Sequence, residues 1–258
     1  MSAERRNIIS QLQRDILSLQ GLKRLPADNK FQFGLGPIKD AFPDNCFPIG
    51  AVHEFITAGA EDAAATRGFI ACLTATLMRN SGVTVWINSS SAIFPPALKA
   101  FGIEPDRVIF ISGLNQKDSL WVMEETLKCE GLAAVIGEIK DVDFTASRRL
   151  QLAVEQSRVT GFIIRQQPRI ATINSCVSRW KITSLPAETE EDLPGIVHPR
   201  WNVELLKIRN GKPGAWQVTW AAGHFEFGAS PVIILTAEEN RKIGLYAEAP
   251  SYYLVPSS

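Results

Sequence analysis

The stretch LAAVIGEIKDVDFTASRRLQLAVEQSRVTGFIIR, residues 132–165, decides the fold class of this 258-residue chain. Its two ends, 132–139 and 160–165, are short apolar runs of the kind that form buried strands. Residues 144–157, between them, are expected to be helical. Strands that are apolar on both faces and separated by a helix are typical of a parallel sheet covered on both sides.

The same alternation continues toward the N-terminus. Further strand candidates are residues 51–57, 83–88 and 107–112. Helical stretches are expected at 62–80, 94–101 and 117–129. We therefore predict an α/β fold in which helices flank a mostly parallel sheet and the crossovers are right-handed.

After residue 165 the pattern changes. CVSRWKIT, residues 176–183, is another strand candidate, and the acidic stretch AETEEDLPG, residues 187–195, is expected to be a solvated loop. Residues 202–209 and 215–221 flank a turn rich in glycine and proline, and the second run alternates apolar and polar side chains. This pattern predicts an antiparallel hairpin extension with one buried face.

The composition excludes several classes of protein. Hydrophobic residues make up 45% of the chain and charged residues 21%, which argues against wholesale disorder. The 27 basic residues balance 27 acidic ones, which argues against a strongly basic nucleic-acid coat protein but not against a local basic patch. No stretch approaches the roughly 20 apolar residues that span a bilayer, and the N-terminus lacks the apolar core of a signal peptide. We expect a cytoplasmic protein without membrane contact.

No metal or hydrolase motif is present. The cysteines are too far apart in sequence to form the paired ligands of a zinc finger and are expected to be free thiols: Cys46, Cys72, Cys129 and Cys176. The three histidines form no HExxH pair, and no GxSxG motif occurs. We expect His53 to be a packed, hydrogen-bonded residue and most tryptophans to lie in the core. These observations predict no catalytic residue, no metal site and no cofactor.

The turn after the first core strand is where a parallel sheet usually holds phosphate. Residues 59–66, GAEDAAAT, have the frame of the phosphate-binding loop GxxxxGK[ST], with Ala64 and Ala65 in the positions of the second glycine and the lysine. Ala65 cannot supply the positive charge of the lysine, and Ala64 hampers the close approach of the backbone to phosphate.

Two acidic residues in this frame are also unfavourable for phosphate binding. Gly59 and Thr66 are kept, but Glu61 and Asp62 would repel a phosphate. The frame is therefore either a degenerate nucleotide loop or an ordinary turn between a strand and a helix.

The order of the pieces resembles a RecA-type core. FPIGAVHEF, residues 47–55, resembles the entry to the phosphate-loop strand, and residues 83–110 resemble the second βαβ unit. LAAVIGE, residues 132–138, matches the Walker B strand, with Glu138 in place of the aspartate that holds the metal.

Four segments between about residue 34 and residue 220 resemble one branch of that superfamily, the ImuA proteins of bacterial mutagenesis cassettes. They are GPIKDAFPDNCFPIGAVHEF, SRRLQLAVEQSRVTGFIIRQ, SRWKI and LLKIRNGKPGAW. RRLQLAVE and RNGKPGAW are the most specific of them.

The resemblance also shows departures from a working ATPase. Ser90 stands in place of the glutamate that would activate water, and Arg165 or Gln166 stands near the polar residue that would sense the γ-phosphate. The resemblance thus implies a non-catalytic RecA-like accessory protein in SOS-induced, error-prone translesion DNA synthesis. The alternatives are a SulA-like inhibitor of cell division and a weak ATPase with a remodelled loop.

The resemblance further implies the partners and their binding segments. The partners are an ImuB-type relative of Y-family polymerases, an error-prone C-family polymerase and, as a further candidate, RecA; the chain would join the nucleoid after DNA damage. In RecA-like proteins the loop after strand 160–165 meets single-stranded DNA. The candidate DNA-contact residues are therefore Arg165, Arg169, Arg179 and Lys181, for which we expect only weak binding because the loop lacks aromatic residues before Trp180.

The domain organisation predicted here has three parts. Residues 1–32 are an N-terminal helix, expected over 3–20, and a linker; residues 33–242 are the core with its hairpin; residues 243–258 are a tail. The apolar stripe of the helix consists of Ile9, Leu12, Ile16 and Leu19. This stripe either packs on its own domain or docks on a partner or a second copy. Arg148 and Arg149 likewise serve either surface salt bridges or partner contact.

Overall fold

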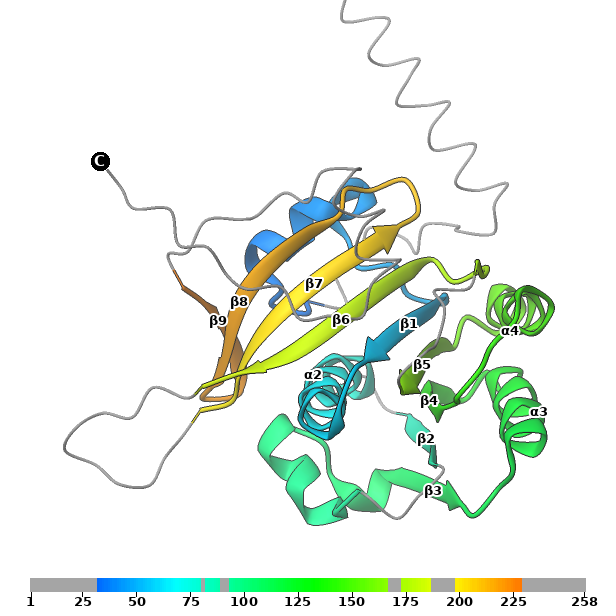
Figure 1. Cartoon of the computed structure of the whole chain (residues 1–258). Coiled ribbons are helices and arrows are strands. Elements are labelled where there is room, and N and C mark those ends of the chain that lie inside the picture. The colour runs from blue at the N-terminus through cyan, green and yellow to red at the C-terminus, as the bar shows by residue number, and fades with distance from the viewer. Residues whose placement is uncertain (1–31, 80–81, 89–92, 167–172, 187–197, 229–258) are drawn as a thin grey trace, which may run out of the picture.

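One mixed sheet organises the computed structural model, which describes residues 32–79, 82–88, 93–166, 173–186 and 198–228 (Figure 1). Several sequence predictions lie outside the described residues: the helix over 3–20 with its apolar stripe, Ser90, Arg169, the acidic loop at 187–195 and the tail from residue 243.

The strand order in this sheet is β3-β2-β4-β5-β1-β6-β7-β8-β9. The strands that pair in parallel are β1 (Val52–Thr57), β2 (Val83–Asn88), β3 (Val108–Ser112), β4 (Leu132–Glu138), β5 (Thr160–Gln166) and β6 (Ser178–Leu185). The antiparallel strands that follow are β7 (Arg200–Ile208), β8 (Gly214–Ala221) and β9 (His224–Phe227). The predicted fold class, a mostly parallel α/β sheet with an antiparallel C-terminal extension, is confirmed.

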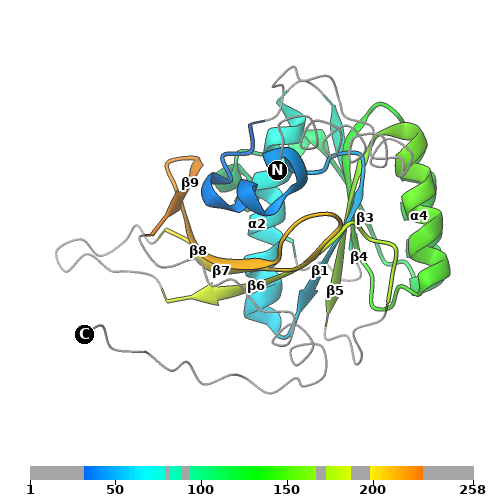
Figure 2. The ribbon, with the colours of Figure 1, turned by 90° about the horizontal axis from the view of Figure 1, so that it is seen from above.

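Helices cover both faces of the parallel part of the sheet. The helix α2 (Ala60–Met78) lies on one face and α4 (Phe144–Ser157) on the other (Figure 2), and α3 (Gln116–Leu127) lies beside α4 (Figure 1). Side-chain caps fix where the last two begin: Asn115 accepts a hydrogen bond from the backbone of Asp118, and Asp143 accepts one from that of Ala146.

The short helical segments have 3₁₀ geometry. They are η1 (Gly36–Ala41), η2 (Pro43–Asn45), η3 (Pro95–Phe101) and η4 (Pro105–Arg107). The stretch expected to be helical at 94–101 is thus a 3₁₀ helix, which starts at Pro95 and ends at Phe101, just before Gly102, a glycine in the left-handed conformation.

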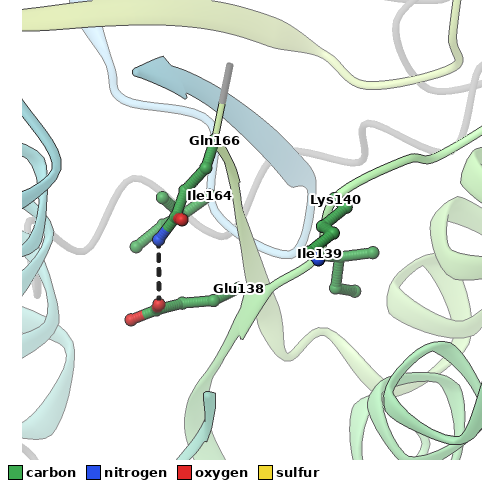
Figure 3. Close-up of a pocket in the computed structure, with 5 residues that line it drawn as sticks. All are labelled: Glu138, Ile139, Lys140, Ile164 and Gln166. Carbon is green, nitrogen blue, oxygen red and sulfur yellow. Dashed lines mark hydrogen bonds between the residues drawn. The ribbon is translucent and has the colours of Figure 1, made fainter. Parts of the chain in front are cut away.

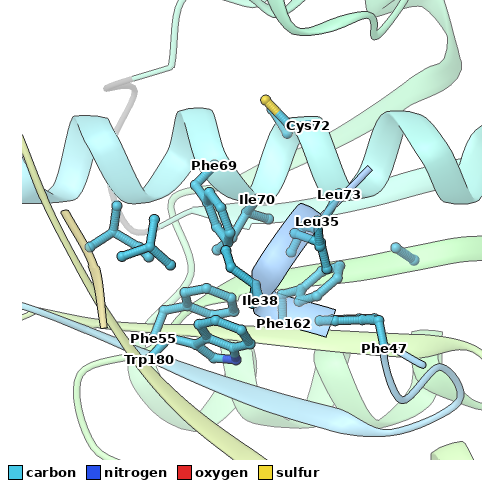
Figure 4. Packing of buried hydrophobic residues seen from close by; sticks show 14 of the residues in the cluster. Leu35, Ile38, Phe47, Phe55, Phe69, Ile70, Cys72, Leu73, Phe162 and Trp180 are labelled. Carbon is cyan, nitrogen blue, oxygen red and sulfur yellow. The ribbon is translucent and has the colours of Figure 1, made fainter. Parts of the chain in front are cut away.

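The larger core lies between α2 and the sheet and extends under the hairpin (Figure 4). Phe55 of β1 and Trp180 of β6 stack at a ring distance of 5.9 Å, and Phe69 of α2 packs on Trp180 at 6.1 Å. The buried tryptophans are Trp86, Trp180, Trp201, Trp216 and Trp220, as expected. Trp121 is the exception, because it lies on the outer side of α3 and is 60% exposed.

The antiparallel extension has one covered and one open face. Trp201, Val203 and Leu205 of β7 point into the large core, whereas Asn202 and Glu204 point to the other side. On that other side the described helices α3 and α4 pack over β1, β2, β4 and β5 (Figures 1 and 2). The open face of β7 and β8 therefore carries no described helix.

Candidate functional site

The turn between β1 and α2 is too short to be a phosphate loop. The strand β1 ends at Thr57 and α2 begins at Ala60, so only Ala58 and Gly59 connect them. Seven of the eight residues of the frame 59–66 are therefore helical. Their backbone N–H groups beyond the first turn bond within the helix and are not available to surround a phosphate. Of the two interpretations, the geometry matches the ordinary strand-to-helix turn.

The side chains of this segment serve the helix and the core. Ala65 and Thr66 are buried, whereas Ala64 and Glu61 are exposed. Glu61 and Asp62 occupy the first turn of α2, where negative charge interacts favourably with the helix dipole. These acidic residues thus have a structural explanation that involves no ligand.

Glu138, at the end of β4, is held by a cation from the chain itself. Arg67 of α2 donates from Nε to Oε1 of Glu138 at 2.8 Å and from Nη2 to Oε2 at 2.9 Å. Gln166, at the end of β5, donates to the same Oε2 at 3.5 Å. The hydrogen bond to Glu138 raises the pKa of Arg67 against the opposing effect of burial. The sequence interpretation missed Arg67, although it directly follows Thr66.

A small pocket lies beside this pair, at the carboxyl ends of β4 and β5 (Figure 3). The residues that line it are Glu138, Ile139, Lys140, Ile164 and Gln166. Its volume of about 10 Å³ corresponds to a single water molecule. Sites for drug-sized ligands usually occupy about 300–1,000 Å³, so this pocket, as the described residues form it, does not fit a nucleotide.

The described residues contain no group of three or more metal-ligating side chains. All four cysteines are free, as expected, with Cys72 and Cys176 buried and Cys46 and Cys129 exposed. Among the described helices, none combines the length and the apolar character that crossing a membrane requires.

A buried ion cluster surrounds Glu54 of β1. Arg165 of β5 donates from Nη1 to Oε1 of Glu54 at 2.8 Å, and Arg179 of β6 donates from Nε to Oε2 at 2.5 Å. Arg165 also lies 3.5 Å from the carboxylate of the exposed Asp141. Burial raises the pKa of Glu54, but the charge of Arg179 and hydrogen bonds from Arg165, Asn174 and Arg179 outweigh it and hold the pKa below its usual range.

The cluster changes the interpretation of the candidate DNA-contact residues. The side chain of Arg165 is only 1% exposed and that of Arg179 only 14% exposed, because both face Glu54. Lys181 is 3.6 Å from Glu204 of β7 and is 26% exposed. The structure thus brings Arg165 and Arg179 together as partners of a buried carboxylate. A glutamate inside the apolar run AVHEFIT was the sequence signal for this cluster.

Arg148 and Arg149 of α4 form salt bridges with glutamates of the same protein. Arg149 pairs with Glu124 of α3, and Arg148 lies 3.9 Å from Glu155 of α4. Of the two roles considered for these arginines, the structure shows the salt bridges.

His53 of β1 is packed and hydrogen-bonded, as expected. Its Nδ1 lies 2.6 Å from Oγ of Ser178, and its Nε2 lies 2.7 Å from the carbonyl oxygen of Pro48. Complete burial lowers the pKa of His53 to about 4.

These features define an α/β protein with a single mixed sheet and, where a phosphate loop would stand, a tight turn beside an internal ion pair. No family model matches the chain. Over 205 residues it is 34% identical to Protein ImuA of Caulobacter vibrioides strain NA1000 / CB15N, a match that covers 74% of this chain and 84% of the relative. Protein ImuA of Caulobacter vibrioides strain ATCC 19089 matches to the same extent. The chain therefore belongs to the ImuA family.

Proposed function

We propose that this chain is a non-catalytic accessory protein of a bacterial mutagenesis cassette and that it acts in error-prone translesion DNA synthesis after DNA damage. Membership of the ImuA family supports the role in mutagenesis. The observation that carries the non-catalytic part is the double hydrogen bond between Arg67 and Glu138, beside a helix that begins at Ala60.

Three requirements of phosphate-loop chemistry are unmet in this arrangement. Such proteins need a loop whose N–H groups surround the phosphates, a lysine beside the terminal phosphates and a carboxylate that helps to hold magnesium. Here the loop is replaced by helix, the lysine position holds the buried Ala65, and Glu138 is already paired with Arg67. These features support a fold that serves as a docking surface.

The family resemblance makes an ImuB-type relative of Y-family polymerases the first partner to test. An error-prone C-family polymerase and RecA are further candidates, and weak contact with single-stranded DNA belongs to the same proposal. Exposed apolar side chains on the outer helices support protein docking: Trp121 on α3 is 60% exposed, and Phe144 and Leu152 on α4 are 58% and 49% exposed. Such side chains on a surface are typical of protein contacts.

Two measurements test the proposal together. First, the gene is deleted in its own bacterium, and we expect the frequency of damage-induced mutations to fall to the uninduced level and to recover when the full chain is supplied. Second, the purified full chain is mixed with the tagged ImuB-type protein of the same cassette, and we expect the two to elute together.

The docking face is tested by variants of the outer helices. Trp121→Ala combined with Leu152→Ala should weaken the complex at least tenfold. The matched control is Phe94→Ala, which removes a 70% exposed aromatic side chain that precedes η3 and belongs to neither α3 nor α4. Unchanged mutagenesis after deletion, together with no complex between the purified proteins, would overturn the proposed function.

A further inference from the structure

Three basic side chains gather beside the crossover that leads from β5 to β6. Lys207 of β7 pairs in register with Arg179 of β6, so the two side chains stand next to each other on the same face of the sheet. Arg209 follows Lys207 by two residues and points to the same side, since both reach the crossover. We refer to Arg179, Lys207 and Arg209 as the cationic row.

The positive charge of this row is only partly neutralised. Both oxygens of Glu54 are occupied by Arg165 and Arg179. Lys207 and Arg209 donate to backbone carbonyl oxygens instead: Nζ of Lys207 lies 3.4 Å from that of Asn174, and Nη2 of Arg209 lies 3.3 Å from that of Ser175. Within the described part of the chain, no carboxylate lies within ion-pair distance of Lys207 or Arg209.

This arrangement is electrostatically costly for the free protein. Like charges opposite each other on neighbouring strands are destabilising. Partial burial lowers the pKa of Lys207, and the charge of Arg179 and, to a smaller extent, that of Arg209 lower it further. A bound anion would relieve this repulsion, so the geometry fits an anionic ligand at the cationic row.

The surface around the row is polar and suits a chain of phosphates. The open face of β6 to β8 continues from the row with polar side chains: Lys181, Asn202, Gln217 and Thr219, and Glu204, whose carboxylate lies 3.6 Å from the ammonium group of Lys181. The described strands of the extension carry no exposed large apolar side chain that could anchor a protein partner. Ile173, which is 83% exposed, precedes Asn174 in the crossover and offers one apolar contact to an unpaired base.

We propose that the cationic row binds the phosphate backbone of single-stranded DNA. Regularly spaced phosphates match several cations on one flat face, and a single strand can bend to that face and place a base on Ile173, which the stacked bases of a duplex cannot do. The choice of single-stranded DNA rests on the proposed function, because translesion synthesis works on unpaired template. The proposed site differs from the one predicted from the sequence, because it includes Lys207 and Arg209. The buried Arg165 does not contact DNA in this proposal and only forms the ion pair with Glu54.

The test is the fluorescence anisotropy of a labelled oligo(dT) of thirty nucleotides, titrated with the full chain at several salt concentrations. The variant Lys207→Gln/Arg209→Gln removes two charges and keeps a hydrogen-bond donor at each position. We expect it to bind at least tenfold more weakly at low salt. The slope of log affinity against log salt should fall by about 1.4, since each phosphate contact with a single strand contributes about 0.7.

The matched control is Lys39→Gln/Lys99→Gln, which removes two exposed charges from η1 and η3, far from the row in sequence and on the α2 side of the sheet. It should bind oligo(dT) as the original chain does. Equal binding by the two double variants would overturn the site. No binding by the original chain at low salt, or equally effective displacement by polyglutamate, would overturn the choice of ligand. Mutagenesis that is unaffected by gene deletion, with oligo(dT) binding as expected, would overturn the proposed function and leave the site intact.

Discussion

Arg67 and Glu138 are joined by two hydrogen bonds, of 2.8 and 2.9 Å, that tie the first half of α2 to the end of β4. The side chain of Glu138 is 1% exposed and that of Arg67 is 16% exposed, so the carboxylate depends on this guanidinium for its charge balance. In this way the chain supplies its own cation at the carboxyl edge of the sheet.

The first prediction concerns the loss of one member of this pair. Arg67→Met leaves the buried carboxylate of Glu138 without its cation, and we expect the free energy of unfolding to fall by about 3 kcal/mol. Arg67→Met/Glu138→Leu replaces both charges by apolar groups and should recover most of that loss. Urea denaturation of the three proteins measures both effects. A double variant as unstable as the single one would show that packing, not the unpaired charge, sets the cost.

The second prediction is that ATP with magnesium does not stabilise the folded protein. A ligand that binds only the folded state at 100 times its dissociation constant adds about 2.7 kcal/mol and raises the melting temperature by several degrees. With residues 60–66 in a helix and Glu138 bound to Arg67, we expect no shift at millimolar ATP. Calorimetric titration should show no saturable heat. A micromolar dissociation constant would contradict the proposed absence of nucleotide chemistry.

The strands and helices of the core could be predicted because the spacing of their apolar residues indicates the type of element. Capping residues in the sequence also mark where a helix begins and ends. The helix over 144–157 has the bounds predicted for it, since Asp143 caps its start and Arg158, in the left-handed conformation, ends it. By contrast, β9 was not predicted, although its polar residues His224 and Glu226 alternate with Phe225 and Phe227. At four residues it is at the lower limit of length at which such an alternation indicates a strand.

The site was less predictable than the fold, because its contacts join residues that are distant in sequence. Glu54 meets Arg165 and Arg179, which lie 111 and 125 residues away. Only the strand order, with β1 between β5 and β6, brings these three side chains together. The frame at 59–66 was misleading for a related reason, since its spacing is the same in a loop and in a helix.

The third prediction concerns this buried cluster. Glu54→Gln keeps the shape of the side chain but removes the charge that Arg165 and Arg179 share. We expect the free energy of unfolding to fall by about 3–5 kcal/mol, because Arg165 and Arg179 lose the buried carboxylate that they share. The control is Glu226→Gln, which removes an exposed carboxylate that lies 3.2 Å from the exposed imidazole of His224 and should change stability by less than about 0.5 kcal/mol. Similar melting curves for the two variants would contradict the importance of Glu54.

The fourth prediction concerns the turn between β7 and β8. A Cβ atom at Gly211 would lie 2.2 Å from the carbonyl oxygen of Ala41, which also accepts a hydrogen bond from the backbone of Lys212. Gly211→Ala must push η1 away from the hairpin, and we expect it to cost about 1–3 kcal/mol. Gly131→Ala is the matched control, because a Cβ there meets no atom within 4 Å. Chemical denaturation should separate the two variants, and equal stability would show that the turn shifts freely.

The last prediction uses the buried imidazole of His53. Nε2 donates to the carbonyl oxygen of Pro48, and Nδ1 accepts from the hydroxyl of Ser178, which in turn accepts from Nε1 of Trp180. This network holds the neutral ring, and complete burial lowers its pKa from 6.5 to about 4. As the pH falls below 6.5 the unfolded chain therefore binds a proton that the folded protein does not bind until about pH 4.

It follows that His53 stabilises the fold fully above pH 6.5 and that this contribution is lost as the pH falls toward 4. At about 1.4 kcal/mol for each pH unit, the loss between pH 7 and pH 5 is about 2 kcal/mol. Urea denaturation across this range measures it. His53→Gln can bond to both partners without titrating, so its stability should change by about 2 kcal/mol less over the same range. If the two proteins lost stability in parallel, another group would be responsible for the acid sensitivity, and the neutral hydrogen-bond network at His53 would be wrong.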